Sequence, residues 1–153
     1  MKPDSLLTKE SLTARLKTYF DRNAHLFHVE TALLYGSWAM GLPRQDSDVD
    51  IGIVFEDEGM PEGKIYGAIN TISLSLTRDL RSEINILPVY HDFRKPMLYY
   101  NVIVQGIPVY ISDYNKYLAL RSNSINQMED FEIFGKKWQL IIARKNLTIL
   151  ENA

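Results

Sequence analysis

The stretch "YGSWAMGLPRQDSDVDIGIVF", residues 35–55, carries the strongest structural and chemical signals of the chain. In its second half, residues 48–55, apolar side chains recur at every other position. This period of two predicts a β-strand with one apolar face. The stretch begins at the end of another short apolar run, residues 30–36, which stops at a glycine and predicts a second strand. We expect a tight turn or a short helix from Ser37 onward.

Two aspartates stand at the beginning of the predicted strand 48–55. Asp48 and Asp50 are two residues apart, so their side chains leave the same face of the strand, with Cα atoms about 6.6–7 Å apart. Ionised carboxylates at that distance repel unless a cation or hydrogen-bond donors compensate them. Mg²⁺ is commonly held by carboxylates and substrate phosphates, and two such ions can stabilise an in-line phosphoryl displacement. The pair therefore predicts a metal-dependent phosphoryl-transfer site.

The Gly36-Ser37 pair predicts the other half of such a site. A glycine at a strand end lets the backbone approach a ligand closely, and amides at the start of a helix favour an anion. The Ser37 hydroxyl adds one more donor. Taken singly, such features are more often a plain turn, a helix cap or a solvated loop. Their order and spacing together favour a site for a nucleoside triphosphate and metal.

The rest of the chain alternates between helical and strand patterns. The spacing of apolar residues predicts helices beginning near Thr8, Ile65 and Pro96 and strands at residues 83–90 and 107–111. This alternation is typical of an α+β (or α/β) domain, with a small mixed β-sheet flanked by helices.

The C-terminal region reads as helical from Asp113 onward. We expect two helical segments, broken near residues 121–124, whose sequence is "RSNS". An aromatic stripe at helical spacing is interpreted as core or as a partner interface rather than a cofactor site; it comprises Tyr114, Tyr117, Phe131, Phe134 and Trp138. We treat residues 1–153 as a single domain whose helical C-terminal extension is 113–153.

Composition narrows the function classes. The chain has 153 residues, is 46% hydrophobic and has a net charge of −2, so we expect no direct nucleic-acid binding and no attraction to anionic membranes. It has no cysteine, which excludes disulfides, thiolate metal sites and a cysteine nucleophile. No signal peptide or membrane-spanning run is evident, and the expected location is cytoplasmic.

Gly36-Ser37, ten intervening residues and then Asp48-Val49-Asp50 resemble the signature of the DNA polymerase β-like nucleotidyltransferase superfamily. The similarity is to its minimal nucleotidyltransferases, the MNT type, and extends over a core of about residues 29–112. It includes "SEINILPVY" at the strand that carries a third acidic residue and "KPMLYYNVIVQGIPVYIS" at a helix and the strand after it. The resemblance implies the nucleotidyltransferase fold.

The resemblance also implies roles for individual residues. Asp48 and Asp50 would bind two Mg²⁺ ions and, with Glu83 as the third carboxylate, form the catalytic and metal-binding set. Gly36 and Ser37 would hold the phosphates of ATP. The sequence departs from the family pattern at Glu83, where relatives usually have Asp, with Asn85 on the same strand face as a poor metal ligand.

A second departure concerns phosphate binding. Many relatives have an arginine where this chain has Met40, in "GSWAMG". Arg44 is the candidate substitute for that phosphate contact, with a solvated loop residue as the alternative.

Three functions follow as hypotheses. The first is an enzyme that transfers AMP from ATP to a protein hydroxyl, by resemblance a tyrosine of a cognate HEPN toxin, and thereby acts as an antitoxin. The second is a catalytically weak or inactive module of the same fold that neutralises its partner by binding. The third, a nucleotidyltransferase for a small molecule, predicts a larger substrate domain than the short C-terminal region offers.

Overall fold

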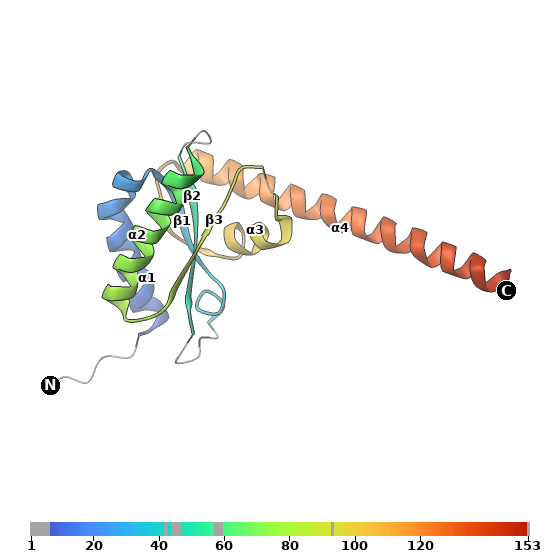
Figure 1. Ribbon diagram of the computed structural model, residues 1–153, viewed down its shortest axis with the longest axis horizontal. Coiled ribbons are helices and arrows are strands. Elements are labelled where there is room, and N and C mark those ends of the chain that lie inside the picture. The colour runs from blue at the N-terminus through green and yellow to red at the C-terminus, as the bar shows by residue number, and fades with distance from the viewer. Residues whose placement is uncertain (1–6, 42, 44–46, 57–59, 93, 153) are drawn as a thin grey trace.

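The computed structural model describes residues 7–41, 43, 47–56, 60–92 and 94–152. One four-stranded sheet lies between helices (Figure 1). The strands are β1 (Val29–Tyr35), β2 (Val49–Phe55), β3 (Ile84–Pro88) and β4 (Ile107–Ile111). The helices are α1 (Lys9–Asn23), α2 (Glu62–Leu80), α3 (Pro96–Ile103) and α4 (Tyr114–Glu151), with a short 3-10 helix, η1, at Ala24–Phe27. The predicted α+β class with a small mixed sheet is confirmed.

The order of the strands is β3-β2-β1-β4. The β1 strand is antiparallel to both of its neighbours, β2 and β4, whereas β2 and β3 are parallel. The end of β1 therefore lies at the same end of the sheet as the beginnings of β2 and β3. Each edge strand contains a proline, Pro88 in β3 and Pro108 in β4, as expected for a residue that cannot donate a ladder hydrogen bond.

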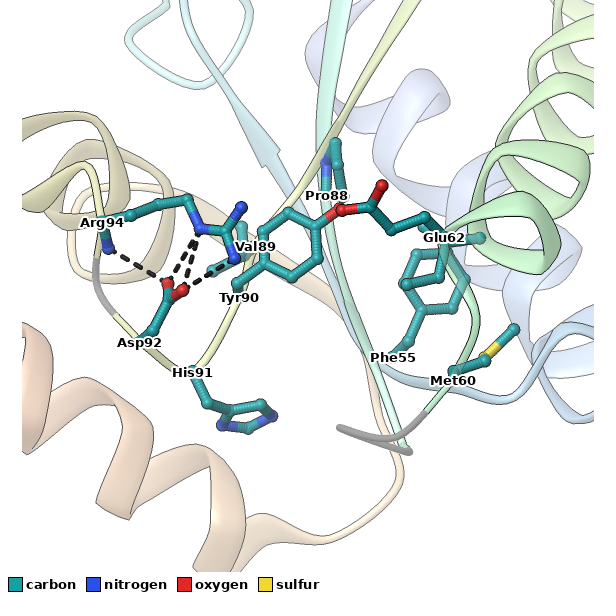
Figure 2. A pocket seen from close by; sticks show the side chains of 10 residues that line it. Phe55, Met60, Glu62, Pro88, Val89, Tyr90, His91, Asp92 and Arg94 are labelled. Carbon is teal, nitrogen blue, oxygen red and sulfur yellow. Dashed lines mark hydrogen bonds and ion pairs between the residues drawn. The ribbon is translucent and has the colours of Figure 1, made fainter.

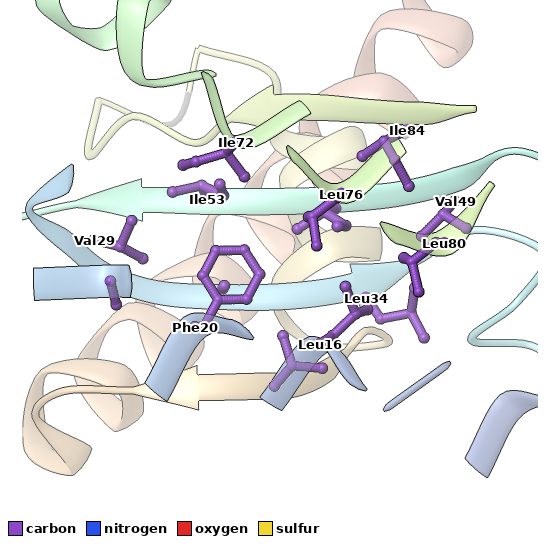
Figure 3. Packing of buried hydrophobic residues seen from close by; sticks show 14 of the residues in the cluster. Leu16, Phe20, Val29, Leu34, Val49, Ile53, Ile72, Leu76, Leu80 and Ile84 are labelled. Atoms are coloured by element: carbon purple, nitrogen blue, oxygen red, sulfur yellow. The ribbon is translucent and has the colours of Figure 1, made fainter. Parts of the chain in front are cut away.

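One face of the sheet is covered by α1 and α2. Thr8 caps α1 by accepting a hydrogen bond from the Ser11 amide, and the Ser11 hydroxyl accepts one from the Thr8 amide in return. Figure 3 shows Phe20 of α1 and Ile72 of α2 packed over Ile53 of β2, and all three are buried. Burying a side chain of this size contributes about 1.5–3 kcal/mol, so this layer holds the strands firmly in place.

The other face is covered by α3 and the beginning of α4. Tyr99 and Val102 of α3 pack with Leu33 of β1 and Val54 of β2, and Leu120 of α4 completes this second cluster. Because apolar helices cover both faces, β1 and β2 are buried almost throughout, and the half-buried Asp50 interrupts the apolar run of β2.

The C-terminal region forms one continuous helix, so the predicted break at residues 121–124 is wrong. Ser and Asn are only moderate helix formers, but Ser124 is buried against the domain together with Tyr117 and Leu120. Packing of this face outweighs the small local preference for a break. Although α4 is 38 residues long, neither it nor any other helix in the described ranges is apolar enough over a sufficient length to cross a membrane.

Candidate active site

The two aspartates lie where the central strand β2 begins, beside the end of β1. In the sheet register Asp50 is opposite Tyr35 of β1 on one side and Asn85 of β3 on the other. Val49 belongs to the core cluster under α1 and α2, so the alternation of the strand directs Asp48 and Asp50 to the opposite face. These residues thus share one face, as the spacing predicts.

A single amide joins the two carboxylates. The side-chain nitrogen of Asn85 donates to Asp48 Oδ2 over 3.2 Å and to Asp50 Oδ1 over 3.4 Å. Sequence reasoning treated Asn85 only as a poor metal ligand and missed this bridging position. The period-two pattern of β3 predicts which of its faces carries Asn85. The position of Asn85 beside the aspartates also depends on the parallel pairing of β3 with β2, which the pattern does not give.

Burial and charge act together on Asp50. Burial raises the pKa of its carboxyl above the ordinary value, and the neighbouring charge of Asp48 raises it further, while the hydrogen bond from Asn85 opposes the shift. Burial also raises the pKa of Tyr35, and the charge of Asp50 adds to that effect. The ionised carboxylates are therefore incompletely compensated by protein groups, which favours a bound cation.

Gly36 is required by the carboxylate beside it. It has φ +76°, a conformation that side chains rarely adopt, and a Cβ atom there would lie 2.5 Å from Oδ2 of Asp50. We expected this glycine to admit a phosphate. In the structure its missing side chain makes room for the Asp50 carboxylate itself, which links the glycine directly to the aspartate pair.

Ser37 begins a turn rather than a helix. The turn is closed by a hydrogen bond from the Met40 amide to the Gly36 carbonyl over 3.1 Å. Trp38, the next residue, is buried in the core, and its indole nitrogen donates to the Ser47 carbonyl over 3.4 Å. Trp38 therefore anchors the loop in the core. The Ser37 side chain is half-buried, and the Met40 side chain is 69% exposed.

The remaining predicted site residues are less closely tied to the pair. Glu83 immediately precedes β3 and is exposed; its carbonyl oxygen accepts a hydrogen bond from the Val49 amide over 2.9 Å. Within the described ranges, no three acidic or histidine side chains form a group that could hold a metal ion. Arg44 lies outside the described residues.

A separate cavity lies at the other end of the sheet. Its volume is about 410 Å³, and it is lined by residues around Phe55 at the end of β2 and Pro88 at the end of β3 (Figure 2). At about 3.3 Å per residue, Phe55 is roughly 16 Å along the strand from Asp50. This cavity is therefore distinct from the aspartate pair.

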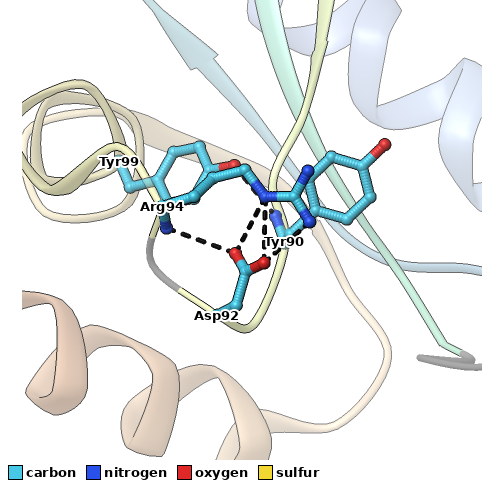
Figure 4. Close-up of polar contacts among 4 residues, drawn as sticks. All are labelled: Tyr90, Asp92, Arg94 and Tyr99. Carbon is cyan, nitrogen blue, oxygen red and sulfur yellow. Dashed lines mark hydrogen bonds and ion pairs between the residues drawn. The ribbon is translucent and has the colours of Figure 1, made fainter.

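An exposed polar cluster borders this distal cavity. The guanidinium of Arg94 lies 4.1 Å from the centre of the Tyr90 ring and 2.7 Å from a carboxylate oxygen of Asp92 (Figure 4). The Tyr90 amide donates to the Tyr99 hydroxyl over 3.4 Å. Pairing with Arg94 lowers the pKa of Asp92. The cluster links Tyr90 to α3 and has a structural explanation without a ligand.

Known proteins resemble the chain in sequence and in fold. Residues 14–115 match the family model described as polymerase beta, nucleotidyltransferase. No curated protein sequence gives a significant match.

Several solved structures share the fold. A toxin-antitoxin structure with AMP-PNP is 15% identical, with 84% of this chain and 96% of that chain covered and a TM-score of 0.60. A structure of a tri-AMPylated HEPN toxin with its MNT antitoxin, from Shewanella oneidensis, is 14% identical, with 86% and 97% covered and a TM-score of 0.55. A candidate minimal nucleotidyltransferase is 27% identical, with 68% and 98% covered and a TM-score of 0.51.

Proposed function

The chain belongs to the polymerase beta nucleotidyltransferase family, and on this premise we propose that it transfers AMP from ATP to a hydroxyl group of a protein acceptor. The proposed acceptor is a tyrosine of a cognate HEPN toxin, which makes the protein an antitoxin. The observation that carries the proposal is the convergence of Asp48 and Asp50 on one face beside Gly36. Similar folds in a complex with a tri-AMPylated HEPN toxin and in one with AMP-PNP support the choice of partner and nucleotide.

The proposed reaction is a displacement at the α-phosphorus of ATP. The acceptor oxygen forms a bond to this phosphorus, the bond from the phosphorus to the oxygen bridging to the β-phosphate breaks, and pyrophosphate leaves. The hydroxyl proton passes to a site carboxylate or to water. Catalysis of this kind depends mainly on positioning and on compensation of negative charge.

The aspartate pair fits a divalent cation. Asp50 is half-buried and repelled by Asp48, and the Asn85 amide offers the pair hydrogen bonds but no charge, so the pair gains from a bound cation. Turned over, that amide presents its oxygen to a cation instead of its nitrogen to the carboxylates. Bound Mg²⁺ ions, two in the proposed site, would supply the positive charge that stabilises the α-phosphate and the leaving pyrophosphate.

The other site residues have proposed supporting roles. Ser37 and the amides of its turn hold the phosphates from the side of β1, Gly36 leaves room for the Asp50 carboxylate, and Arg44 adds a phosphate contact. Glu83 stands at the start of β3 as an outer carboxylate, and its exposure leaves it free to accept the proton of the acceptor hydroxyl. If Glu83 has this role, Glu83→Gln should lower the transfer rate and leave ATP affinity nearly unchanged.

A second candidate function is favoured by one observation. Asn85, rather than a carboxylate, faces both aspartates across β2 and β3. A site with two acidic ligands binds metal more weakly than a site with three, and Met40 provides no positive charge for phosphate. The alternative is therefore a catalytically weak module that neutralises its partner by covering it.

One experiment separates the two functions. The full chain is incubated with Mg²⁺, the product of a neighbouring HEPN-like gene and ATP labelled at the α-phosphate; γ-labelled ATP is the control. Enzymatic transfer labels the partner only from the α-position and adds one AMP per modified residue, which mass spectrometry assigns to a side chain. The Asp48→Asn/Asp50→Asn protein should bind the partner and leave it unlabelled.

The outcomes lead to different conclusions. If label still appears on the partner with the double variant, the assignment of the catalytic aspartates is wrong. If the unchanged chain binds and neutralises the partner without labelling it, the binding module is the correct function.

A further inference from the structure

The C-terminal half of α4 extends away from the domain. The buried side chains of this helix, Tyr117, Leu120 and Ser124, all belong to its first third. Beyond Ser124 the helix continues to Glu151 and projects from the rest of the molecule (Figure 1). At 1.5 Å per residue, residues 125–151 extend about 40 Å. Most of the stability of a helix in a protein comes from packing of an apolar face, and no described side chain beyond Ser124 is buried in the single chain.

The projecting segment carries a regular apolar stripe. We define the α4 stripe as Phe131, Phe134, Trp138, Ile141 and Ile142, with side chains 45%, 66%, 55%, 47% and 42% exposed. Its spacing of three and four residues continues the spacing of the buried face, on which Leu120 and Ser124 lie. A repeat of this kind brings one seam of a helix against another helix.

We propose that the α4 stripe binds the α4 stripe of a second copy of this chain in antiparallel orientation, with the two-fold axis between Phe134 and Trp138. Such an interface is isologous, since the same surface serves both copies. Phe134 of each copy then packs against Trp138 of the other. Phe131 of each copy meets Ile141 of the other.

The charges at the two ends of one edge of the stripe are complementary. Asp130 and Arg144 lie on the same edge, two heptads apart, with Lys137 between them. Antiparallel pairing about the proposed axis brings each Asp130 beside Arg144 of the second copy, which gives two opposite-charge pairs. It also brings the two Lys137 side chains beside each other at the axis, and this single like-charge contact opposes the two attractive ones. In a parallel, in-register pair the equivalent edges of the two helices lie on opposite sides of the interface, so Asp130 and Arg144 would not meet and both attractive contacts would be absent.

Gly135 has an explanation in this arrangement. A glycine destabilises the interior of a helix, and a Cβ atom at Gly135 would meet nothing within 4 Å in the single chain. Next to the two-fold axis, the two copies of Gly135 lie opposite each other. The missing side chains there let the helices approach and leave space for the Trp138 indoles.

The length of the helix also fits. Counting the same number of residues outward from an axis near residue 136 reaches Glu151 in one direction and Arg121 in the other. In this pairing Glu151 of each copy lies at the level where the other helix leaves its domain, and the projecting residues 125–151 are covered. Ile133, Leu140 and Leu147 lie on the opposite side of α4 and take no part in this pairing.

The oligomeric state of the full chain gives the first test. Sedimentation velocity across a concentration series should show a dimer for the unchanged chain and a monomer for Trp138→Glu. Tyr66→Glu is the matched control, because Tyr66 is an aromatic side chain 54% exposed on α2, outside the stripe. Circular dichroism verifies that both variants remain folded. A monomeric unchanged chain, or a dimer that survives Trp138→Glu, would overturn the proposal.

Single cysteines test the orientation, since the chain has none of its own. Gly135→Cys should cross-link two copies through a short bismaleimide. Ile149→Cys should not, because in the antiparallel pair its two copies are about 40 Å apart. Efficient cross-linking at Ile149 would indicate a parallel pair and reject the proposed axis.

A charge exchange tests the pairing directly. Arg144→Glu converts both attractive pairs into repulsive ones and should weaken the dimer roughly tenfold. Asp130→Arg added to Arg144→Glu restores opposite charges across the interface and should recover the affinity. If the double variant is no tighter than Arg144→Glu alone, these side chains do not face each other. If the chain stays monomeric and pairs only when mixed with a HEPN-like protein, the stripe serves that partner instead.

Discussion

Substitution of Asn85 by aspartate tests the central geometry of the site. Asn85→Asp replaces the donor that bridges Asp48 and Asp50 with a third carboxylate. Two hydrogen bonds to charged groups are lost, and a like charge is added within hydrogen-bonding distance of both. A hydrogen bond to a charged group contributes about 1.5–3 kcal/mol, but Asn85 is exposed, and solvent screens the interaction. We therefore expect a total loss of about 1–3 kcal/mol in the absence of divalent cations.

The assay is thermal unfolding with and without Mg²⁺. For a chain of this size each kcal/mol changes the melting temperature by about 2–4 °C, so the variant should melt about 2–12 °C lower in EDTA. Three carboxylates bind a hard cation better than two, so Mg²⁺ should restore much of this loss and stabilise the variant more than the unchanged protein. Transfer of AMP should then need less Mg²⁺ than in the unchanged protein.

A matched control is Asn70→Asp. Asn70 is an exposed residue on α2, so the same chemical change there should alter the melting temperature little and without Mg²⁺ dependence. The reasoning would be refuted if Asn85→Asp melted like the unchanged protein in EDTA and Mg²⁺ stabilised both equally. That result would mean that the three side chains do not share one site.

Three further predictions concern Asp50, Gly36 and Ser37. Asp50→Asn should stabilise the protein more at neutral than at acidic pH. The pKa of Asp50 is raised in the folded protein, so its ionisation costs stability as the pH rises through and above the ordinary pKa range of Asp. Denaturant titrations at several pH values measure this, and a stability difference that stays constant with pH would contradict it. Gly36→Ala should lower both the melting temperature and AMP transfer, because the new Cβ meets the Asp50 carboxylate; normal activity with a native melting temperature would argue against that contact. Ser37→Ala should weaken ATP binding about ten- to a hundredfold by calorimetry through loss of one hydrogen bond to phosphate, whereas a lower melting temperature with unchanged ATP affinity would identify Ser37 as a structural residue.

The fold was largely predictable because its strands are short apolar runs whose alternation or bounding glycines identify them in the sequence. The period-two pattern identified β2 to within one residue, and β4 matched its predicted range of residues 107–111. The break predicted in α4 was wrong because local preference at residues 121–124 is worth only tenths of a kcal/mol per residue. Burial of Leu120 and Ser124 against the domain decides the outcome, and a local pattern does not contain that contact.

The site was predictable only where one strand determines it. Asp48 and Asp50 share a face because of spacing within β2 alone. The bridging position of Asn85 depends on the parallel register of β2 and β3, in which Asp50 pairs with Asn85, and residues 35 positions apart reveal no register by themselves. The contact between Gly36 and Asp50 likewise arises from pairing between strands, and the sequence alone did not predict it. The role of Gly36 in binding phosphate stays a prediction.

The prolines in the two edge strands, β3 and β4, protect the protein against aggregation through its sheet edges. An outer strand offers unpaired amides and carbonyls to any passing extended chain, which is how sheets of separate molecules fuse into aggregates. Pro88 and Pro108 each remove an amide from such an edge. A strand from another molecule therefore cannot form a continuous hydrogen-bond ladder with β3 or with β4, and these prolines disfavour extension of the four-stranded sheet.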